Sequence, residues 1–157
     1  MYKKIAVFAS GGGTDFQSVV DANEKSKFCS IAYLVASKPN IGAIERAKKH
    51  GIQTLVYDKE SGVAYYINNI EELKKLDVTA HGANEKIGSF NRIEEFKIIF
   101  SASEYEEGLY RGSIRSKEKS VVEIATKYGG GGHKLACGVR GLTLQQVMAL
   151  IDELKKL

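Results

Sequence analysis

The chain has 157 residues, of which 43% are hydrophobic and 27% charged, and its formal net charge is +4. This is an ordinary composition for a globular protein with a real core, and the mild positive charge is compatible with a phosphate-bearing partner. No apolar run approaches the roughly 18 residues that a membrane helix needs, so we expect no membrane partner and no signal peptide. Cys29 and Cys137 are expected to be buried, reduced thiols of a cytoplasmic protein.

Strand and helix patterns alternate with short loops through residues 3–58. The sequence predicts strands at 3–9, 30–36 and 52–58, and helices at 14–27 and 41–51. Short loops between alternating elements are typical of a parallel sheet with right-handed crossovers. The first third is therefore predicted to be a Rossmann-like βαβαβ half-sheet.

The regular alternation of strands and helices ends after Asp58, and we place a domain boundary between residues 59 and 60. Strands are predicted at 62–68, 96–103, 108–116 and 134–141, and helices at 70–76, 121–128 and 143–157, the last capped by Thr143. Residues 78–92 have no clear pattern. Strands 96–103 and 108–116 should pair antiparallel, because their link is too short for a crossover helix. The predicted fold class is α/β, with the parallel half-sheet joined to a mixed α/β domain.

A first glycine loop, SGGGTDFQ, joins the first strand to the first helix. Phosphate binding is one interpretation of this loop, because glycines let the backbone approach a ligand and a helix start offers free N–H groups. The loop is neither a P-loop nor a dinucleotide fingerprint. A tight strand-to-helix turn is the alternative, and the carboxylate of Asp15 would repel a phosphate dianion.

A second glycine loop lies in KYGGGGHKLACG, residues 127–138. One glycine is enough to end a helix, and a run of four can form a nest of N–H groups for an anion. His133 and Lys134 would add donors at the edge of such a nest. The alternative is a flexible helix-to-strand link with a solvated histidine.

A basic strip precedes this loop in YRGSIRSKEK. On a strand, Arg111, Ser113 and Arg115 share one face, which could meet a phosphodiester. A solvated strand edge, kept basic against aggregation, is the alternative. No cluster of histidines or carboxylates indicates a metal, and we predict neither a metal nor another cofactor.

Residues 3 to about 59 resemble the N-terminal half of phosphoribosylglycinamide formyltransferase, in KIAVFASGGGTDFQSVVDA and ASKPNIGAIERAKKHGIQTLVYDK. The resemblance implies that Gly13, Thr14 and Asp15 contact the phosphate of a ribotide, although that family commonly has Asn at the place of Asp15. The catalytic Asn, His and Asp of that family belong to its second half, which has no counterpart here.

Residues from about 61 to 157 resemble the C-terminal domain associated with DHH phosphoesterases, such as oligoribonucleases that degrade nanoRNA and hydrolyse phosphoadenosine phosphate. The segments that show this resemblance are GVAYYI, IGSFNRIEEFKIIFSASE, YRGSIRSK and VVEIATKYGGGGHKLACG. The resemblance implies nucleotide binding by the glycine loop at Gly130, Gly131 and Gly132, by His133, and by the RS pair, Arg115 and Ser116. The metal site of that family belongs to a separate N-terminal domain.

We interpret the chain as a recombined or engineered chimera, with a natural fusion as the alternative. The expected function is binding of a nucleotide or short oligonucleotide without catalysis. The alternatives are a phosphoesterase that needs a separate metal-bearing catalytic domain, and a folded chimera without biochemical function. Each fragment has lost a packing partner, so we also expect homo-oligomers formed by segment exchange or edge pairing.

Overall fold

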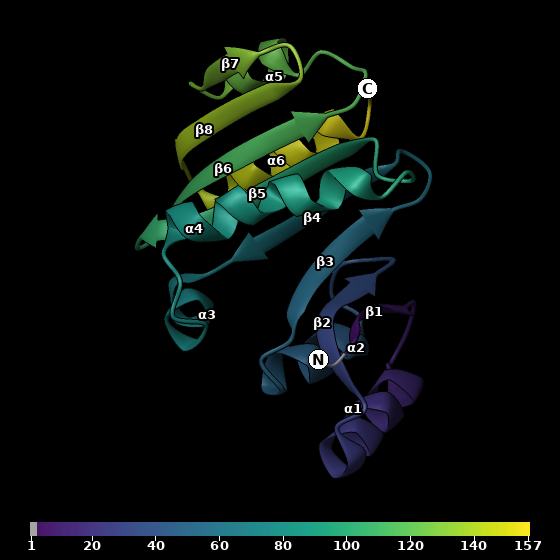
Figure 1. Cartoon of the computed structure of the whole chain (residues 1–157). Coiled ribbons are helices and arrows are strands. Elements are labelled where there is room, and N and C mark those ends of the chain that lie inside the picture. Colours follow the sequence, from purple (N-terminus) through teal and green to yellow (C-terminus); the bar gives the residue numbers. More distant parts are fainter. Residues whose placement is uncertain (1–2) are drawn as a thin grey trace. The chain divides into compact units, whose positions relative to one another are not determined.

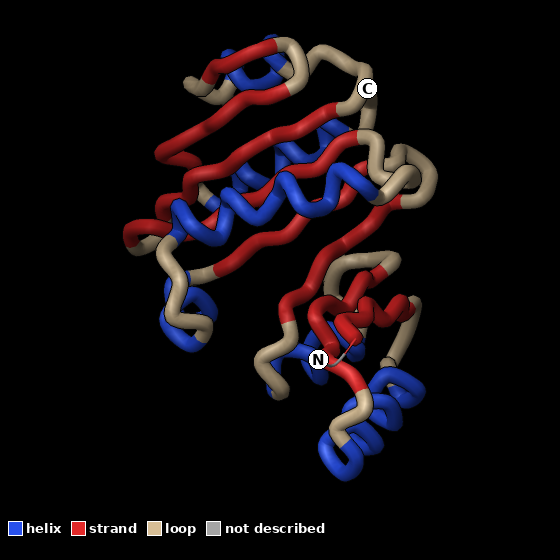
Figure 2. The backbone as a smooth tube through the Cα atoms, viewed as in Figure 1, coloured by secondary structure: helices blue, strands red, loops and turns tan. Residues whose placement is uncertain are grey.

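A computed structural model describes residues 3–157 of the chain, and its backbone divides into two compact units (Figure 2). The first unit ends at Tyr57 and the second begins at Asp58. Each unit has strands and helices of its own, so the two are described separately.

The first unit is a parallel sheet with two helices. Its elements are β1 (Lys3–Ala9), α1 (Thr14–Ser26), β2 (Cys29–Ala36), α2 (Gly42–Lys49) and β3 (Gln53–Asp58), whose last residue is the first of the second unit. β2 pairs in parallel with both β1 and β3. The predicted alternation and the parallel pairing are therefore confirmed, with element ends within two residues of the expected ones.

The core of the first unit lies between the helices and one face of its sheet. Phe16 and Val20 of α1, Leu34 of β2 and Ile44 of α2 belong to one buried cluster. On β1 the side chains alternate, and Phe8 is 68% exposed on the face that this cluster does not cover. This unit therefore packs both helices on the same side of β1.

The second unit has a mixed five-stranded sheet. Its strands are β4 (Val63–Asn68), β5 (Ile98–Glu106), β6 (Leu109–Ser116), β7 (Gly131–His133) and β8 (Ala136–Leu142). They lie in the order β4-β5-β6-β8-β7, with β4 parallel to β5 and the other pairs antiparallel. The predicted antiparallel pair, β5 and β6, is confirmed. The hairpin is tighter than expected, because β5 continues through Tyr105 and Glu106 and leaves only two residues for the turn.

Helices cover the two faces of this sheet. They are α3 (Ile70–Lys75), α4 (Ala80–Glu85), the 3₁₀ helix η1 (Lys86–Arg92), α5 (Val122–Lys127) and α6 (Leu144–Leu154). Figure 1 shows α4 in front of β4 and β5, and α6 behind the strands; no helix lies in front of β6 and β8. α6 buries Val147, Leu150, Ile151 and Leu154. Thr143 is its N-cap, as the sequence predicts, and also forms a capping box with Gln146.

The segment 78–92, which sequence patterns left unassigned, forms α4 and η1. The Thr79 side chain accepts a hydrogen bond from the Gly82 N–H at 3.1 Å and so caps α4. The buried Asn84 amide accepts a bond from the Ser103 hydroxyl at 2.9 Å and donates one to the Arg111 carbonyl at 3.0 Å. Asn68 in turn donates to Ser103 at 3.1 Å. A polar network therefore attaches α4 to the sheet, beside the buried Ala83.

Candidate functional site

The second glycine loop owes most of its glycines to backbone geometry. Gly129 has φ 72°, and Gly132 has φ 146°. A Cβ on Gly130 would lie 2.1 Å from the Gly138 carbonyl oxygen, which no side chain tolerates. Only Gly131 has open space around a Cβ and no positive φ. Three of the four glycines are thus required by the fold itself.

The N–H groups of this loop are less free than an anion nest needs. The Gly129 N–H donates to the Thr126 carbonyl at 3.0 Å, and the Gly130 N–H donates to the Ala125 carbonyl at 2.8 Å. Both bonds finish α5. The next three residues form the strand β7, which the sequence did not predict, and pair with β8. The first two glycines therefore complete a helix instead of presenting their amides to a ligand.

His133 and Arg115 come together through strand register. His133 pairs with Ala136 on β8, and Ala136 pairs with Arg115 on β6. Directly paired residues of antiparallel strands point to the same face, so both side chains flank a single methyl group. His133 is exposed, and Arg115 is half-buried with its Nη1 donating to the Ile114 carbonyl at 2.8 Å. The structure thus brings together two candidates that lie 18 positions apart in the sequence.

The next row on the same face has almost no side chains. Gly131 of β7 pairs with Gly138 of β8, which pairs with Ser113 of β6. Both glycines are exposed. We call Gly131, Gly138, Ser113 and Ala136 the floor. A flat backbone surface of this kind allows a ligand to approach closely, and Arg115 and His133 border it at one end.

The other end of the floor has two further arginines. Arg111 pairs with Arg140 across β6 and β8. The Arg140 guanidinium carbon lies 4.8 Å from the centre of the Tyr105 ring, which is a cation–π distance. The sequence indicated Arg111 as part of the basic strip, but it gave no signal for Arg140, because the pairing partner of a strand residue is a tertiary feature.

Ser116 lies apart from its motif partner. Side chains alternate along β6, so Ser116 points to the face opposite Arg115, and it pairs with the buried Ile98. Its hydroxyl is buried and has no hydrogen-bond partner among the described residues. Its backbone N–H donates to the Leu135 carbonyl at 2.9 Å and so ties the strand end to the turn between β7 and β8. The structure therefore places Arg115, and not the Ser116 side chain, beside the floor.

A thiol lies directly beneath the row of Arg115 and His133. The Cys137 Sγ donates to the His133 carbonyl at 3.2 Å. Burial raises the pKa of the Cys137 thiol, whereas the nearby positive charge of Arg115 acts in the opposite direction. Cys29 and Cys137 are both free and buried, as predicted.

The glycine loop is anchored to α6 through its preceding residues. The Lys127 ammonium lies 2.6 Å from Glu153 Oε1, and the Tyr128 hydroxyl donates to the same oxygen at 2.9 Å. The hydrogen bond from Lys127, followed by that from Tyr128, holds the pKa of the Glu153 carboxyl below its usual range. Burial, followed by the hydrogen bond to Glu153, raises the pKa of Tyr128.

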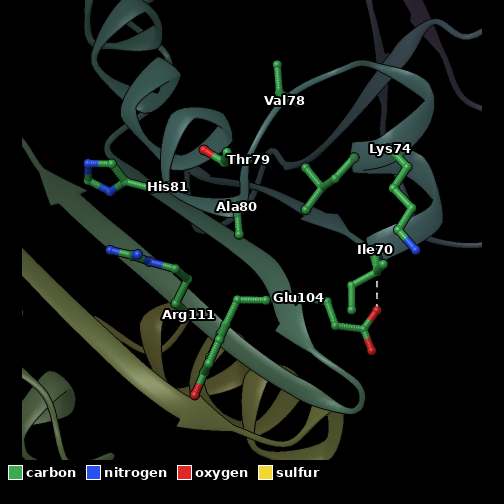
Figure 3. Close-up of a pocket in the computed structure, with 10 residues that line it drawn as sticks. Ile70, Lys74, Val78, Thr79, Ala80, His81, Glu104 and Arg111 are labelled. Atoms are coloured by element: carbon green, nitrogen blue, oxygen red, sulfur yellow. Dashed lines mark hydrogen bonds between the residues drawn. The ribbon is translucent and has the colours of Figure 1, made fainter.

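A hollow of about 390 Å³ opens in the second unit near Arg111 (Figure 3). Its polar lining comes from α3, from the start of α4 and from the β5–β6 pair: Lys74, Thr79, His81, Glu104, Tyr105 and Arg111. Sequence reasoning assigned nothing to His81, which lies in the segment without a pattern, or to Lys74, which lies on the predicted helix 70–76 without a motif.

In the first unit, the first glycine loop packs tightly against α2. Gly13 has φ 76°, and a Cβ there would lie 2.7 Å from Ala43. Thr14 and Asp15 begin α1 and are exposed. Arg46, which sequence reasoning did not single out, donates from Nε to the Gly12 carbonyl at 2.9 Å. The candidates Gly13, Thr14 and Asp15 are contiguous at this helix start, and the packing alone accounts for Gly13.

Neither a metal-donor cluster nor a membrane helix is found in the described part of the chain. Within residues 3–157 no three His, Cys, Asp or Glu side chains gather closely enough to hold a metal ion. In the same range, no helix combines the length and the apolar character needed to span a membrane.

A family model for the DHHA1 domain matches residues 61–157. A probable bifunctional oligoribonuclease and PAP phosphatase NrnA from Streptococcus mutans is 30% identical over 130 residues, which cover 83% of this chain and 41% of that protein. Because 130 residues exceed the length of segment 61–157, this alignment extends into the first unit.

The phosphoribosylglycinamide formyltransferase of Bacillus subtilis is 40% identical over 80 residues, which cover 48% of this chain and 41% of the enzyme. Both resemblances expected from the sequence are therefore confirmed. Among solved structures, an exopolyphosphatase-related protein from Bacteroides fragilis matches with a TM-score of 0.56 at 19% identity, over 65% of this chain and 31% of that protein. The chain spans less than half the length of each of these proteins.

Proposed function

Since the chain belongs to the DHHA1 domain family, we propose that its second unit binds a nucleotide, or the end of a short oligonucleotide, on the uncovered face of β6, β8 and β7. The phosphate lies at the row of Arg115 and His133, and the nucleoside lies over the floor. The observation that carries this proposal is the strand register that sets Arg115 and His133 on either side of Ala136, next to a surface of glycines.

The chemistry of this row suits a phosphate group. A guanidinium binds phosphate through charge-assisted hydrogen bonds, which are about twice as strong as neutral ones. The imidazole of His133 can add a donor from the other side. Gly131 and Gly138 leave room for the ligand, because neither has a Cβ that would occupy the surface. The names of the relatives, an oligoribonuclease and PAP phosphatase among them, agree with a nucleotide ligand.

We propose that this unit binds without cleaving. Phosphoester hydrolysis of the kind that uses metals requires several converging carboxylates or histidines. The described residues offer no such group, so they do not fit a metal centre. The face of Arg115 and His133 has two cationic or hydrogen-bond-donating side chains, which supports a binding role.

The second candidate is a phosphoesterase whose catalytic groups belong to a separate domain. It is favoured by one observation: the oligoribonuclease relative from Streptococcus mutans is more than twice as long as the aligned segment. On this reading the second unit holds the substrate for chemistry performed elsewhere. Manganese-dependent release of mononucleotide from a short RNA by the purified chain would favour an enzyme that is complete in itself and contradict both candidates.

We interpret the whole chain as a recombined or engineered chimera in which the first unit contributes a ribotide-like phosphate loop of reduced affinity. The exposed carboxylate of Asp15 at the start of α1 supports that reduction. The alternative is a natural fusion, which would join the same formyltransferase-like and DHHA1 segments. We also propose weak self-association through the first unit, because Phe8 is exposed on the uncovered face of β1. Size-exclusion chromatography of the wild type and of Phe8→Ser tests that proposal.

The binding proposal is tested by titration of adenosine monophosphate into the wild type, Arg115→Ala, Asp15→Asn and Lys119→Ala. Lys119 is the matched control, because it is an exposed cation of the same motif beyond the end of β6. We expect Arg115→Ala to weaken binding about tenfold or more, since it removes a charge-assisted hydrogen bond. Asp15→Asn and Lys119→Ala should stay close to the wild type. If Asp15→Asn changes the affinity several-fold while Arg115→Ala does not, the nucleotide binds in the first unit instead.

A further inference from the structure

We infer that the hollow beside Arg111 is a separate binding site for a small amphipathic carboxylate. The anionic head of this ligand binds the Arg111 guanidinium, and its apolar body packs against α3 and the segment that leads into α4. The hollow has a volume of about 390 Å³, within the range of about 300–1,000 Å³ that is typical of small-molecule sites. The inference concerns a ligand other than a nucleotide, and it does not depend on the proposed function.

The two ends of the hollow differ in chemistry. Figure 3 shows the side chains of Arg111 and His81 at one end, and those of Ile70, Lys74 and Glu104 at the other. The apolar part of the lining comes from α3 and from residues 78–80: Ile70, Leu73, Val78 and Ala80. Three of these four residues are only half-buried, so they leave aliphatic surface open to a ligand. A molecule in the hollow therefore meets a cation at one end and aliphatic side chains beyond it.

The Arg111 side chain is available to bind an anion. No hydrogen bond or ion pair of its guanidinium is found among residues 3–157, although the residue is half-buried. The Arg111 carbonyl accepts a 3.0 Å hydrogen bond from the buried Asn84 amide, so the backbone that carries this side chain is held in place. A guanidinium binds a carboxylate through two parallel hydrogen bonds, and partial burial strengthens them. Arg111 is therefore suited to hold the head of the ligand.

The other charged or titratable groups of the lining do not compete for that role. The His81 Nε2 lies 3.2 Å from Glu85, with which it pairs. Both carboxylate oxygens of Glu104 accept backbone N–H groups, at 2.9 Å and 2.7 Å. Lys74 is exposed, so water can hydrate its ammonium group. Arg111 thus remains as the half-buried charge of the lining that a ligand can satisfy.

The charge of the lining favours a monoanion. Lys74 and Arg111 are positive and Glu104 is negative, which leaves one positive charge when His81 is counted as neutral. A carboxylate balances that single charge. A phosphate dianion would leave an excess of negative charge in a hollow that already contains Glu104. The aliphatic wall points the same way, because it offers no hydrogen-bonding side chain to the three oxygens of a phosphate group.

The pairing of two arginines is a second sign of an anionic ligand. Arg111 stands directly opposite Arg140, and like charges in that position destabilise a sheet. Arg140 is partly compensated by the Tyr105 ring, whose centre lies 4.8 Å from its guanidinium carbon. A carboxylate on Arg111 would offset the remaining repulsion.

This site is distinct from the row of Arg115 and His133. Arg111 and Arg115 share one face of β6 but are four residues apart, which is about 13 Å along a strand. A carboxylate at Arg111 and a phosphate at Arg115 therefore use different cations. Substitution of each arginine can test one site without removing the donor of the other.

The test uses three probes on the full chain: 4-methylpentanoate, 4-methylpentanamide and acetate. The amide has the shape of the first probe without its charge, and acetate has the charge without the apolar body. Binding is followed by two-dimensional NMR titration, which detects weak affinities and locates the residues whose signals move. The variants are Arg111→Ala, Val78→Thr, Arg115→Ala and Lys75→Ala. Lys75 is the matched control, because it is exposed on α3 but does not line the hollow.

We expect 4-methylpentanoate to move the signals of the hollow and to bind at least tenfold more tightly than either other probe. Arg111→Ala should weaken its binding about tenfold, because a charge-assisted pair is lost. Val78→Thr nearly preserves the shape of the wall and makes it polar, so binding should weaken roughly threefold. Arg115→Ala and Lys75→Ala should bind this probe like the wild type.

Several results would overturn the inference. They are equal binding of the carboxylate and the amide, signals that move only outside the hollow, and no binding of 4-methylpentanoate to the wild type. Val78→Thr decides the matter if Arg111→Ala does not fold, since wild-type affinity in that variant would exclude the aliphatic wall. If Arg115→Ala abolishes carboxylate binding and Arg111→Ala does not, the carboxylate occupies the phosphate row, and the inference fails while the proposed function stands.

Discussion

The Tyr128 hydroxyl donates a 2.9 Å hydrogen bond to Glu153 and thereby joins the end of α5 to α6 at the residue before the glycine run. Lys127 binds the same carboxylate oxygen at 2.6 Å. Because both donors precede the loop directly, Glu153 restrains the place where β7 begins.

This anchor should depend on pH. The hydrogen bonds from Lys127 and Tyr128 lower the pKa of Glu153, so its contribution to stability is present above the ordinary carboxyl pKa and is lost as the pH falls through the lowered value. We therefore expect the melting temperatures of the wild type and Glu153→Gln to differ at neutral pH and to converge in acid. Glu118→Gln, an exposed loop residue, is the control. A difference that persists unchanged at low pH would contradict the assignment.

Substitution of the second-loop glycines by alanine should lower the stability of the protein to different extents. Gly130→Ala forces a Cβ to within 2.1 Å of the Gly138 carbonyl, and we expect it to destabilise the protein by about 1–3 kcal/mol or more. Gly131→Ala meets no atom within 4 Å, and should change stability by less than about 0.5 kcal/mol. Urea denaturation of both variants measures the contrast. Equal losses would show that the loop does not hold the described conformation.

The buried amide of Asn84 should be needed for the attachment of α4. Asn84→Ala removes its hydrogen bonds to Ser103 and to the Arg111 carbonyl, and we expect a loss of about 1–3 kcal/mol in the free energy of unfolding. Asn91→Ala, at an exposed position of η1, serves as the control and should be nearly neutral. A midpoint of denaturation that is unchanged in Asn84→Ala would disprove the role of this network.

Damage to the first glycine loop should stay within the first unit. Gly13→Ala places a side chain at φ 76° and against Ala43, and the left-handed conformation alone costs roughly 1–2 kcal/mol. Hydrogen exchange read by mass spectrometry should show faster exchange in residues 3–57 and little change in 58–157. Gly11→Ala has open space and is the control. Equal loss of protection throughout the chain would mean that the two units unfold together.

The elements of the first unit could be predicted almost completely, because strands such as β1 and helices such as α2 follow local patterns between short loops. Local pattern also predicted the antiparallel pairing of β5 with β6 and the cap of α6 at Thr143. It was insufficient for α4, which is attached to the sheet by the hydrogen bonds of the buried Asn84 as well as by the packing of the small Ala83. It also missed β7, because glycines have no strand preference of their own and this strand exists only through its pairing with β8.

Sequence could predict the candidate site only for residues of one strand, where alternation shows which side chains share a face. Alternation correctly placed Arg111 and Arg115 on one face of β6. The same alternation separates Arg115 from Ser116, a consequence that the resemblance to a family motif obscured. The partners Arg140 and His81 come from β8 and α4, and the sequence carries no local signal for such tertiary neighbours.

The floor of Gly131, Gly138, Ser113 and Ala136 has a consequence for what the protein can distinguish. Reading a base requires side-chain amides, carboxylates or guanidinium groups that match the hydrogen-bonding edge of that base. A surface of backbone and methyl groups offers no such match, and a lone serine hydroxyl can bond to any base. Adenine, guanine, cytosine and uracil should therefore be accepted about equally, and the protein would select its ligands by their phosphates and their length and remain indifferent to their sequence.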